Sequence, residues 1–281
     1  MERIMKMLNS LSWFAASEPG SGPVVHISSD TVFTVAGLEI SNSMVYMWIC
    51  SLIIMTILIY VARKMTLRPK KGFTQFVEIG TDFITNLIEG SLGDRRKALK
   101  YAPYFVAIFF FIAMSNIMGL LPGVGEAVKI GDTPLLRAFT ADLNGTFAIA
   151  FVSMLMIQYF AIRESGLIGH IRHYFAGKLW NPLTYVIGFY EIFGELVRIF
   201  SLALRLFLNI AIGEVIIAVF AYLGSSVGPV TAFPFLMLEL GVALLQAYIF
   251  VMLSITYLSL AIKHGHDDVD ELEAVAAGMK L

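Results

Sequence analysis

Residues 182–223 read PLTYVIGFYEIFGELVRIFSLALRLFLNIAIGEVIIAVFAYL. The pair Asn181-Pro182 that opens this stretch is typical of a helix start, and no further proline interrupts it. An unbroken helix of this length measures about 63 Å, whereas the hydrocarbon core of a bilayer is only ~30 Å thick. We therefore expect one long apolar helix that is steeply tilted in a membrane or extends beyond it.

The composition of the whole chain also indicates a membrane protein. Hydrophobic residues make up 58% of the 281 residues and charged residues only 15%, whereas a soluble domain carries about 25% charged residues. Further apolar runs long enough to cross a bilayer lie at 43–62, 101–121, 143–162 and 230–263. The sequence thus predicts an all-α multi-pass membrane protein with about five crossings. We expect an N-terminal segment 1–41, a single membrane bundle over 42–264 and an acidic, flexible tail over 265–281.

Two other helices have special features. Pro234 favours a start of the last helix near Ala232, and its apolar pattern reaches about Ile262, a length of roughly 45 Å. We expect this helix, like 182–223, to be strongly tilted. Between the first two spans, the apolar residues of 73–90 recur at helical spacing opposite a polar face. This predicts an amphipathic helix at the membrane interface, although packing against partner helices would give the same pattern.

The distribution of basic residues indicates the orientation. The connection 63–100 holds nine Lys or Arg residues, whereas 122–142 holds only Lys129 and Arg137. Because basic residues concentrate in cytoplasmic connections, 63–100 is predicted to be cytoplasmic. The N-terminal segment then lies outside, and five crossings place the tail in the cytoplasm.

Polar side chains form one stripe along 182–223. At 100° per residue, several of them fall within about 40° of Arg205. In the last helix two polar residues seven positions apart share a face, and Glu214 lies on the face of its helix opposite Arg205. The stripe consists of Glu191, Arg198, Ser201, Arg205 and Asn209, and the pair in the last helix is Glu239 and Gln246.

Arg205 is costly to bury in an apolar helix. Its guanidinium keeps its charge at every physiological pH, and burying it in a membrane helix costs about 2.5–3.5 kcal/mol even on the lenient insertion scale. No acid stands three or four residues away, so its partner must come from another helix or another chain. Because ionisable residues inside a membrane mark ion pathways, we expect functional roles for Arg205, Glu214 and Glu239.

For other polar residues a structural role stays open. Asn209 and Gln246 could simply bridge helices by hydrogen bonds. Arg198 could form an ion pair with Glu195 or Glu191 that ties the helices together.

Four separated blocks resemble subunit a of F-type ATP synthases, the stator channel beside the rotating ring of c subunits. They are NIMGLLPG at 116–123, TADLN at 140–144, SLALRLFLNIAIGE at 201–214 and LLQAYIFVMLSITYLSLA at 244–261. The resemblance extends over about residues 40–264. It implies that Arg205 is the essential stator arginine. It also implies an outward half-channel lined by Asn209, Glu214, Glu239 and Gln246, an inward one with Glu191 and Ser201, and polar positions at Asn116, Asn144 and, near the outer mouth, Asp142.

The chain departs from the family pattern at several of these positions. Some members have glutamate at the place of Glu214 and histidine at that of Glu239, and others have the reverse, but this chain has glutamate at both. The order of proton transfer, and the choice between proton and sodium, therefore stay open. Gly119 replaces a common acid, and Leu208 replaces the usual glycine before Asn209.

The resemblance implies a proton-conducting stator subunit in a bacterial cell (inner) membrane. Its expected partners are the c-subunit ring, the b-subunit peripheral stalk, the remaining ATP synthase subunits and membrane lipid. The chain has no GxxxxGK[ST] phosphate loop and no HExxH motif, so we expect a non-enzymatic subunit with no cofactor, no metal and no nucleic acid. A sodium-translocating subunit is the main alternative. A secondary transporter would predict internal repeats, which the sequence lacks.

Overall fold

The computed structural model describes residues 31–35, 38–64, 72–121, 125–130, 133–166, 182–224 and 227–276. The N-terminal 30 residues, the basic residues of 65–71 and the end of the tail, which carried sequence-based expectations, lie outside the described residues. The chain divides into two compact units. Unit 1 comprises 1–74, 108–146 and 204–248, and unit 2 comprises 75–107, 147–203 and 249–281.

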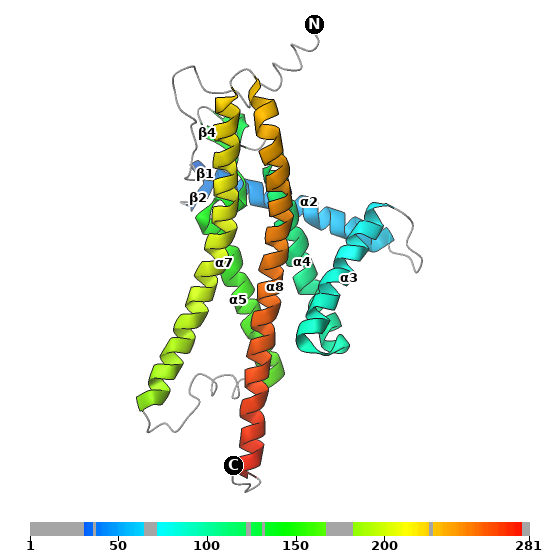
Figure 1. The fold of residues 1–281 in the computed structure, drawn as a ribbon, viewed down its shortest axis with the longest axis vertical. Helices are drawn as coiled ribbons and strands as arrows, with labels where there is room; N and C mark the ends of the chain where they lie inside the picture. The colour runs from blue at the N-terminus through cyan, green and yellow to red at the C-terminus, as the bar shows by residue number, and fades with distance from the viewer. Residues whose placement is uncertain are drawn as a thin grey trace. The chain divides into compact units, whose positions relative to one another are not determined.

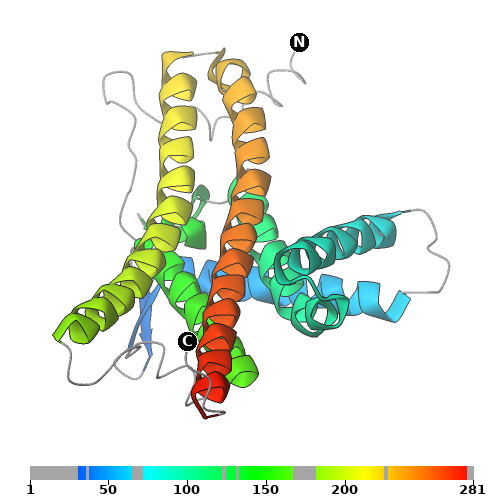
Figure 2. The same cartoon turned by 60° about the horizontal axis from the view of Figure 1, so that its bottom comes forward.

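Five helices are long and apolar enough to cross a membrane, which confirms the all-α multi-pass class. They are α2 (Asn42–Lys64), α4 (Arg95–Gly119), α5 (Leu143–Ser165), α7 (Pro182–Leu223) and α8 (Gly228–Ala276). The bounds of α7 agree with the prediction. In unit 1 the C-terminal part of α7, yellow, and the N-terminal part of α8, light orange, run side by side in both ribbon views (Figures 1 and 2).

The last helix is longer than its sequence pattern suggested. It begins at Gly228 rather than near Ala232, and it continues past Ile262 to Ala276, through residues expected to form a flexible tail. At its start the Thr231 hydroxyl donates to the carbonyl of Phe220 at 2.7 Å, which ties the first turn of α8 to α7. The continuation follows from the helix-forming Glu, Leu and Ala residues of 271–276, which one glycine at 265 does not interrupt.

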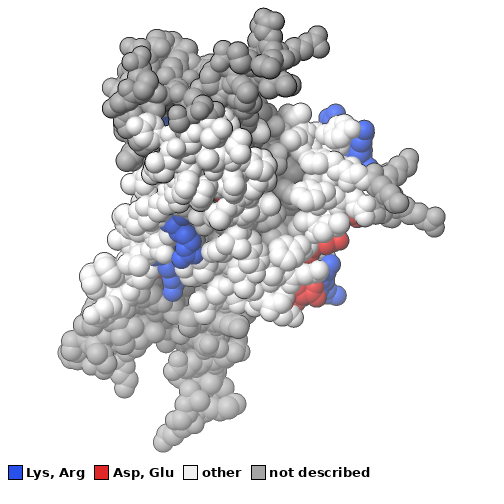
Figure 3. All heavy atoms as spheres, turned by 45° about the horizontal axis from the view of Figure 1, so that its top comes forward, with Lys and Arg blue, Asp and Glu red and all other residues white. Residues whose placement is uncertain are grey.

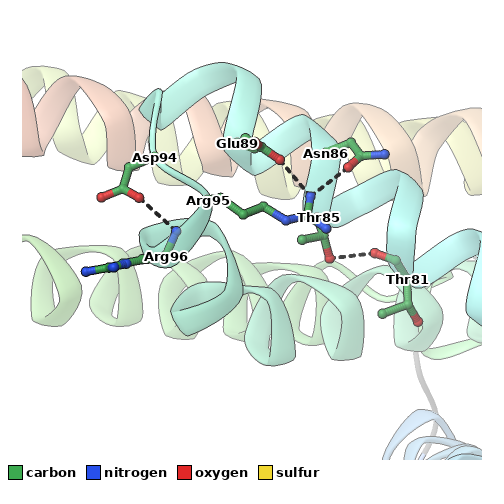
Figure 4. Close-up of polar contacts among 7 residues, drawn as sticks. All are labelled: Thr81, Thr85, Asn86, Glu89, Asp94, Arg95 and Arg96. Atoms are coloured by element: carbon green, nitrogen blue, oxygen red, sulfur yellow. Dashed lines mark hydrogen bonds and ion pairs between the residues drawn. The ribbon is translucent and has the colours of Figure 1, made fainter. Parts of the chain in front are cut away.

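Helix α3 (Phe73–Leu92) is the expected amphipathic helix. Its apolar side is divided, because Ile84 and Ile88 are buried whereas Phe76 and Phe83 are exposed. Asp94 caps the next helix: its carboxylate accepts the backbone N–H of Arg96 at 2.8 Å, which explains why α4 starts six residues before the expected Tyr101 (Figure 4).

Charged groups join the helix ends of unit 2. Arg95 reaches back to Glu89 at 2.6 Å (Figure 4). Glu164, near the end of α5, contacts Lys100 and accepts a hydrogen bond from Tyr101 at 2.5 Å. On the face drawn in Figure 3 most of the described surface is uncharged, apart from a few patches of basic and acidic side chains, as expected for a membrane chain.

Two antiparallel hairpins were not predicted from the sequence. They are β1 (Thr31–Val35) with β2 (Leu38–Ser41), and β3 (Gly125–Ile130) with β4 (Thr133–Leu136). Both belong to unit 1, where α2 contacts β2, β4 and the short 3-10 helix η2 (Phe139–Ala141). The second hairpin thereby brings residues 137–142 into the core of the unit.

Tyr46 of α2 is part of this core. Its ring is buried, and its hydroxyl donates to the carbonyl of Ser115 in α4 at 2.9 Å. Cys50, one turn further on, is also buried, as expected for a small packing residue.

Candidate functional site

Arg205 lies in the part of α7 that belongs to unit 1. The helix persists here because it is built from Leu, Ala and Ile, with no proline. Arg205 itself is half-buried. Leu204, Leu208 and Ile212, which follow one another at single-turn spacing, are 42%, 46% and 53% exposed. Arg205 is therefore adjacent to an exposed apolar stripe, and the unusual Leu208 belongs to that stripe.

The carboxyl group of Glu239 rests directly on α7. A Cβ added at Gly213 would overlap both carboxylate oxygens of Glu239, so the two helices meet at this point through a residue without a side chain. Glu239 is only 5% exposed. This contact brings Glu239 beside Glu214, the neighbour of Gly213 in the chain.

Glu214 is half-buried and belongs to the same cluster of charges. It interacts electrostatically with Glu239 and with Arg137, which precedes η2. Arg137 was not recognised as a candidate from the sequence, where it counted only as one of two basic residues in an outer connection. Two carboxyl groups and a guanidinium thus come together in unit 1.

Several buried polar atoms of unit 1 have no hydrogen-bond partner within the described residues. Buried polar groups are normally paired, and leaving one unpaired costs about 1–3 kcal/mol. A set of such groups is a suitable environment for water or a hydrated proton. The atoms belong to Ser115, Asn116, Thr140, Asn209, Glu239 and Gln246.

Four of these residues were candidates from the sequence: Asn116, Asn209, Glu239 and Gln246. They come from three helices that the chain places in one compact unit. Ser115 and Thr140 were missed. Their only signal was their position beside Asn116 and within TADLN.

Asp142 has a structural role. One of its carboxylate oxygens accepts the backbone N–H of Asn144 at 3.0 Å, as the N-cap of α5. The other accepts the hydroxyl of Ser43 at 2.5 Å. Asp142 therefore fixes the start of α5 to α2, and its expected place in a proton path stays a prediction. The side chain of Asn144 is exposed.

Close packing around Gly119 explains why this chain lacks the acidic residue that is common at this position in the family. A Cβ there would lie 2.9 Å from the Cβ of Ala138, which is closer than side chains normally approach. The helix α4 and the segment before η2 are thus in close contact, and no acidic side chain fits between them.

The remaining candidates lie in unit 2. Ser201 is half-buried, and the side chain of Glu191 falls outside the described residues. The guanidinium of Arg198 lies over the ring of Tyr257 in α8, with its central carbon 5.1 Å from the ring centroid. Glu195, which was considered as a partner of Arg198, accepts a hydrogen bond from the amide of Gln158 in α5.

These features define a multi-pass membrane protein whose helices carry buried charged and polar side chains. The family described as ATP synthase A chain matches residues 44–259, and the chain belongs to this family. It is similar to the ATP synthase subunit a of Anaeromyxobacter sp. (strain Fw109-5), with 32% identity over 68% of this chain and 45% of the relative. The subunit of that name from Moorella thermoacetica is 27% identical over 70% of this chain and 80% of the relative. The chain thus spans less than half the length of the first of these relatives.

Proposed function

We propose that the chain is the proton-translocating stator subunit of an ATP synthase membrane sector, with two offset half-channels beside a ring of c subunits. Membership of the ATP synthase A chain family supports the stator role. The observation that carries the proton path is the set of buried polar atoms without hydrogen-bond partners among the described residues of unit 1, which includes atoms of Glu239, Gln246 and Asn209.

Arg205 separates the two half-channels in this proposal. Each rotor subunit carries a carboxylic acid that crosses lipid in its neutral form and must lose its proton at the stator. A fixed cation favours the carboxylate, because a charge pair at ~4 Å is worth about 4 kcal/mol at an effective dielectric of 20. That corresponds to about a thousandfold change in the protonation equilibrium. Arginine holds its charge throughout, whereas a buried lysine can lose its proton.

The rotor packs against the exposed apolar stripe of α7 in this account. Leu204, Leu208 and Ile212 form an exposed apolar surface beside Arg205, and on α8 Leu238 and Leu245 are 61% and 56% exposed. An apolar ring of helices would cover such surfaces and leave lipid on the remaining sides. The peripheral b subunit and the other synthase subunits complete the proposed assembly.

The outward half-channel uses Glu214 and Glu239, and the inward one uses Glu191 with Ser201. A membrane potential of 100 mV supplies about 2.3 kcal/mol for each proton that crosses, and the offset between the two paths converts this free energy into rotation. In this orientation, the tail 265–281 lies in the cytoplasm and the segment 1–41 lies outside a bacterial cell membrane.

ATP-driven proton pumping by the whole complex in inverted vesicles tests the proposal. The Arg205→Lys variant should assemble and yet fail to pump, because lysine is a point charge that can be deprotonated. Normal pumping by this variant would refute the proposed role of Arg205.

The Glu191→Gln variant tests the inward half-channel. It should lower the proton flux per assembled complex and shift its dependence on cytoplasmic pH. An exposed ion pair at the interface is worth only about 0–1 kcal/mol, so a structural role would instead change the amount of complex alone.

The same vesicles distinguish a proton pump from a sodium pump, since a sodium pump would lose its ion flux when Na⁺ is removed.

A further inference from the structure

Arg137 is a buried cation outside the membrane helices. It lies between β4 and η2, and only 8% of its surface is exposed. A guanidinium cannot shed its charge, and a buried charge is costly unless other groups compensate it. A solvated basic residue of an outer connection would not be held in this way.

The backbone around Arg137 is packed on α7. The guanidinium donates to the carbonyl of Ala141 at 3.2 Å. Ala138 and Ala141, which flank η2, form a buried apolar cluster with Ile210. Ile210 precedes Glu214 by four residues, so the two share one face of α7. The segment that carries Arg137 therefore lies against the face that carries Glu214.

The charged and titratable groups of this region come from four elements. Asp142 is held by the N-cap of α5 and by Ser43. Tyr46 of α2 donates its hydroxyl to a backbone carbonyl and interacts electrostatically with Glu214. Glu214 in turn interacts with Arg137 and Glu239.

We propose that Arg137 is the fixed counter-cation of the Glu214 carboxyl group, and that through Glu214 it sets the pH range in which Glu214 and its neighbour Glu239 exchange protons with the outside. This inference rests on the proposed function. Two carboxylates in one buried site repel each other, and a permanent cation offsets this repulsion. The cation also disfavours a second mobile cation such as Na⁺ at the site. A proton, in contrast, is transferred as part of a covalent O–H group. Arg137 is thus a positioning residue that acts through the two acids.

The test uses whole complexes in inverted vesicles, whose lumen corresponds to the outer side. Proton flux per assembled complex is measured as the lumen is acidified, for Arg137→Gln and Arg137→Lys. A carboxylate without its neighbouring cation keeps its proton to higher pH. Pumping by Arg137→Gln should therefore stop at a luminal pH about one unit higher, which corresponds to a tenfold change in proton binding. Arg137→Lys supplies a cation that can be deprotonated when buried, so its profile should lie between those of the wild type and of Arg137→Gln.

Arg163→Gln is the matched control. It removes one cation from an exposed position in unit 2, and it should leave the profile unchanged. A wild-type profile for Arg137→Gln would overturn the proposal. So would a loss of assembled complex with an unchanged profile per complex, because that is the result of a merely structural role.

A further variant covers the case in which Arg137→Gln does not assemble. If Arg137 compensates the acids, Glu214→Gln added to Arg137→Gln should restore assembly, and failure of the double variant to assemble would overturn the proposal. The Arg205→Lys experiment distinguishes failure of the proposed function from failure of this inference. Normal pumping by Arg205→Lys would refute the proposed function, whereas a failure of the Arg137 prediction alone refutes only this inference.

Discussion

Gly213→Ala should place a methyl group where the Glu239 carboxyl group now rests. The added Cβ overlaps both carboxylate oxygens, so the carboxyl group must move by roughly 1 Å to reach an ordinary van der Waals distance. The end of a glutamate side chain can move in this way, and we therefore expect the complex to assemble. Overpacking of this kind costs about 1–3 kcal/mol.

The effect on transport should be larger than the effect on assembly. If this cost falls on the proton-transfer step, at about 1.4 kcal/mol per tenfold change in rate, the flux falls roughly 5- to 150-fold. A reactive group misplaced by about 1 Å loses rate to a similar extent. The assay is ATP-driven proton pumping in inverted vesicles, normalised to the amount of assembled complex.

Gly241→Ala is the matched control for this prediction. Gly241 lies two residues after Glu239 on α8, and a Cβ added there meets nothing within 4 Å. This variant should pump normally, and its helix should gain up to about 1 kcal/mol from the better helix former. If Gly213→Ala also pumps at the wild-type rate, the contact between Gly213 and Glu239 has no role in the proton path.

Three further predictions concern unit 1. Asp142→Ala should lower the thermal stability of the purified complex, because loss of a helix cap alone costs about 0.5–2 kcal/mol. Asp142→Asn should retain most of that stability, and equal losses in both variants would argue against the cap. Tyr46→Phe should cost about 0.5–1.5 kcal/mol by removing one buried hydrogen bond, and an unchanged melting temperature would contradict this. Cysteines at Glu214 and Glu239, in a chain whose native cysteine is replaced, should react with a water-soluble thiol reagent from the outer side; protection of both would count against an aqueous outward path.

The apolar helices could be predicted from sequence because length and hydropathy are local properties. The prediction for α7 was correct at both ends, since no residue inside it interrupts the helix. The start of α4 was missed even though Asp94, its cap, is a recognisable signal. The start of α8 was predicted too late, because Pro234 suggested a helix start near Ala232. The hydrogen bond from Thr231 to Phe220, which holds the earlier first turn, joins two helices and has no local sequence pattern.

The candidate site was only partly predictable for the same reason. Ionisable residues in apolar helices stand out in the sequence, which is how Arg205, Glu214 and Glu239 were found. Arg137 lies in a mixed segment that resembles a solvated connection, and its burial depends on packing against α7. The contact of the Glu239 carboxyl group with Gly213 brings together positions that are 26 residues apart in the sequence, and no sequence periodicity relates them.

Passive proton conductance tests the central claim most directly. Vesicles that carry the whole complex, with the rotor held by its ATP-hydrolysing sector and no nucleotide present, are given a potassium-diffusion potential, and proton entry is followed with a pH-sensitive dye. The account predicts that wild-type vesicles stay tight, whereas Arg205→Ala vesicles leak, because no cation then separates the two half-channels. Arg205→Ala vesicles as tight as the wild type, at equal amounts of complex, would contradict the role of Arg205 as the barrier.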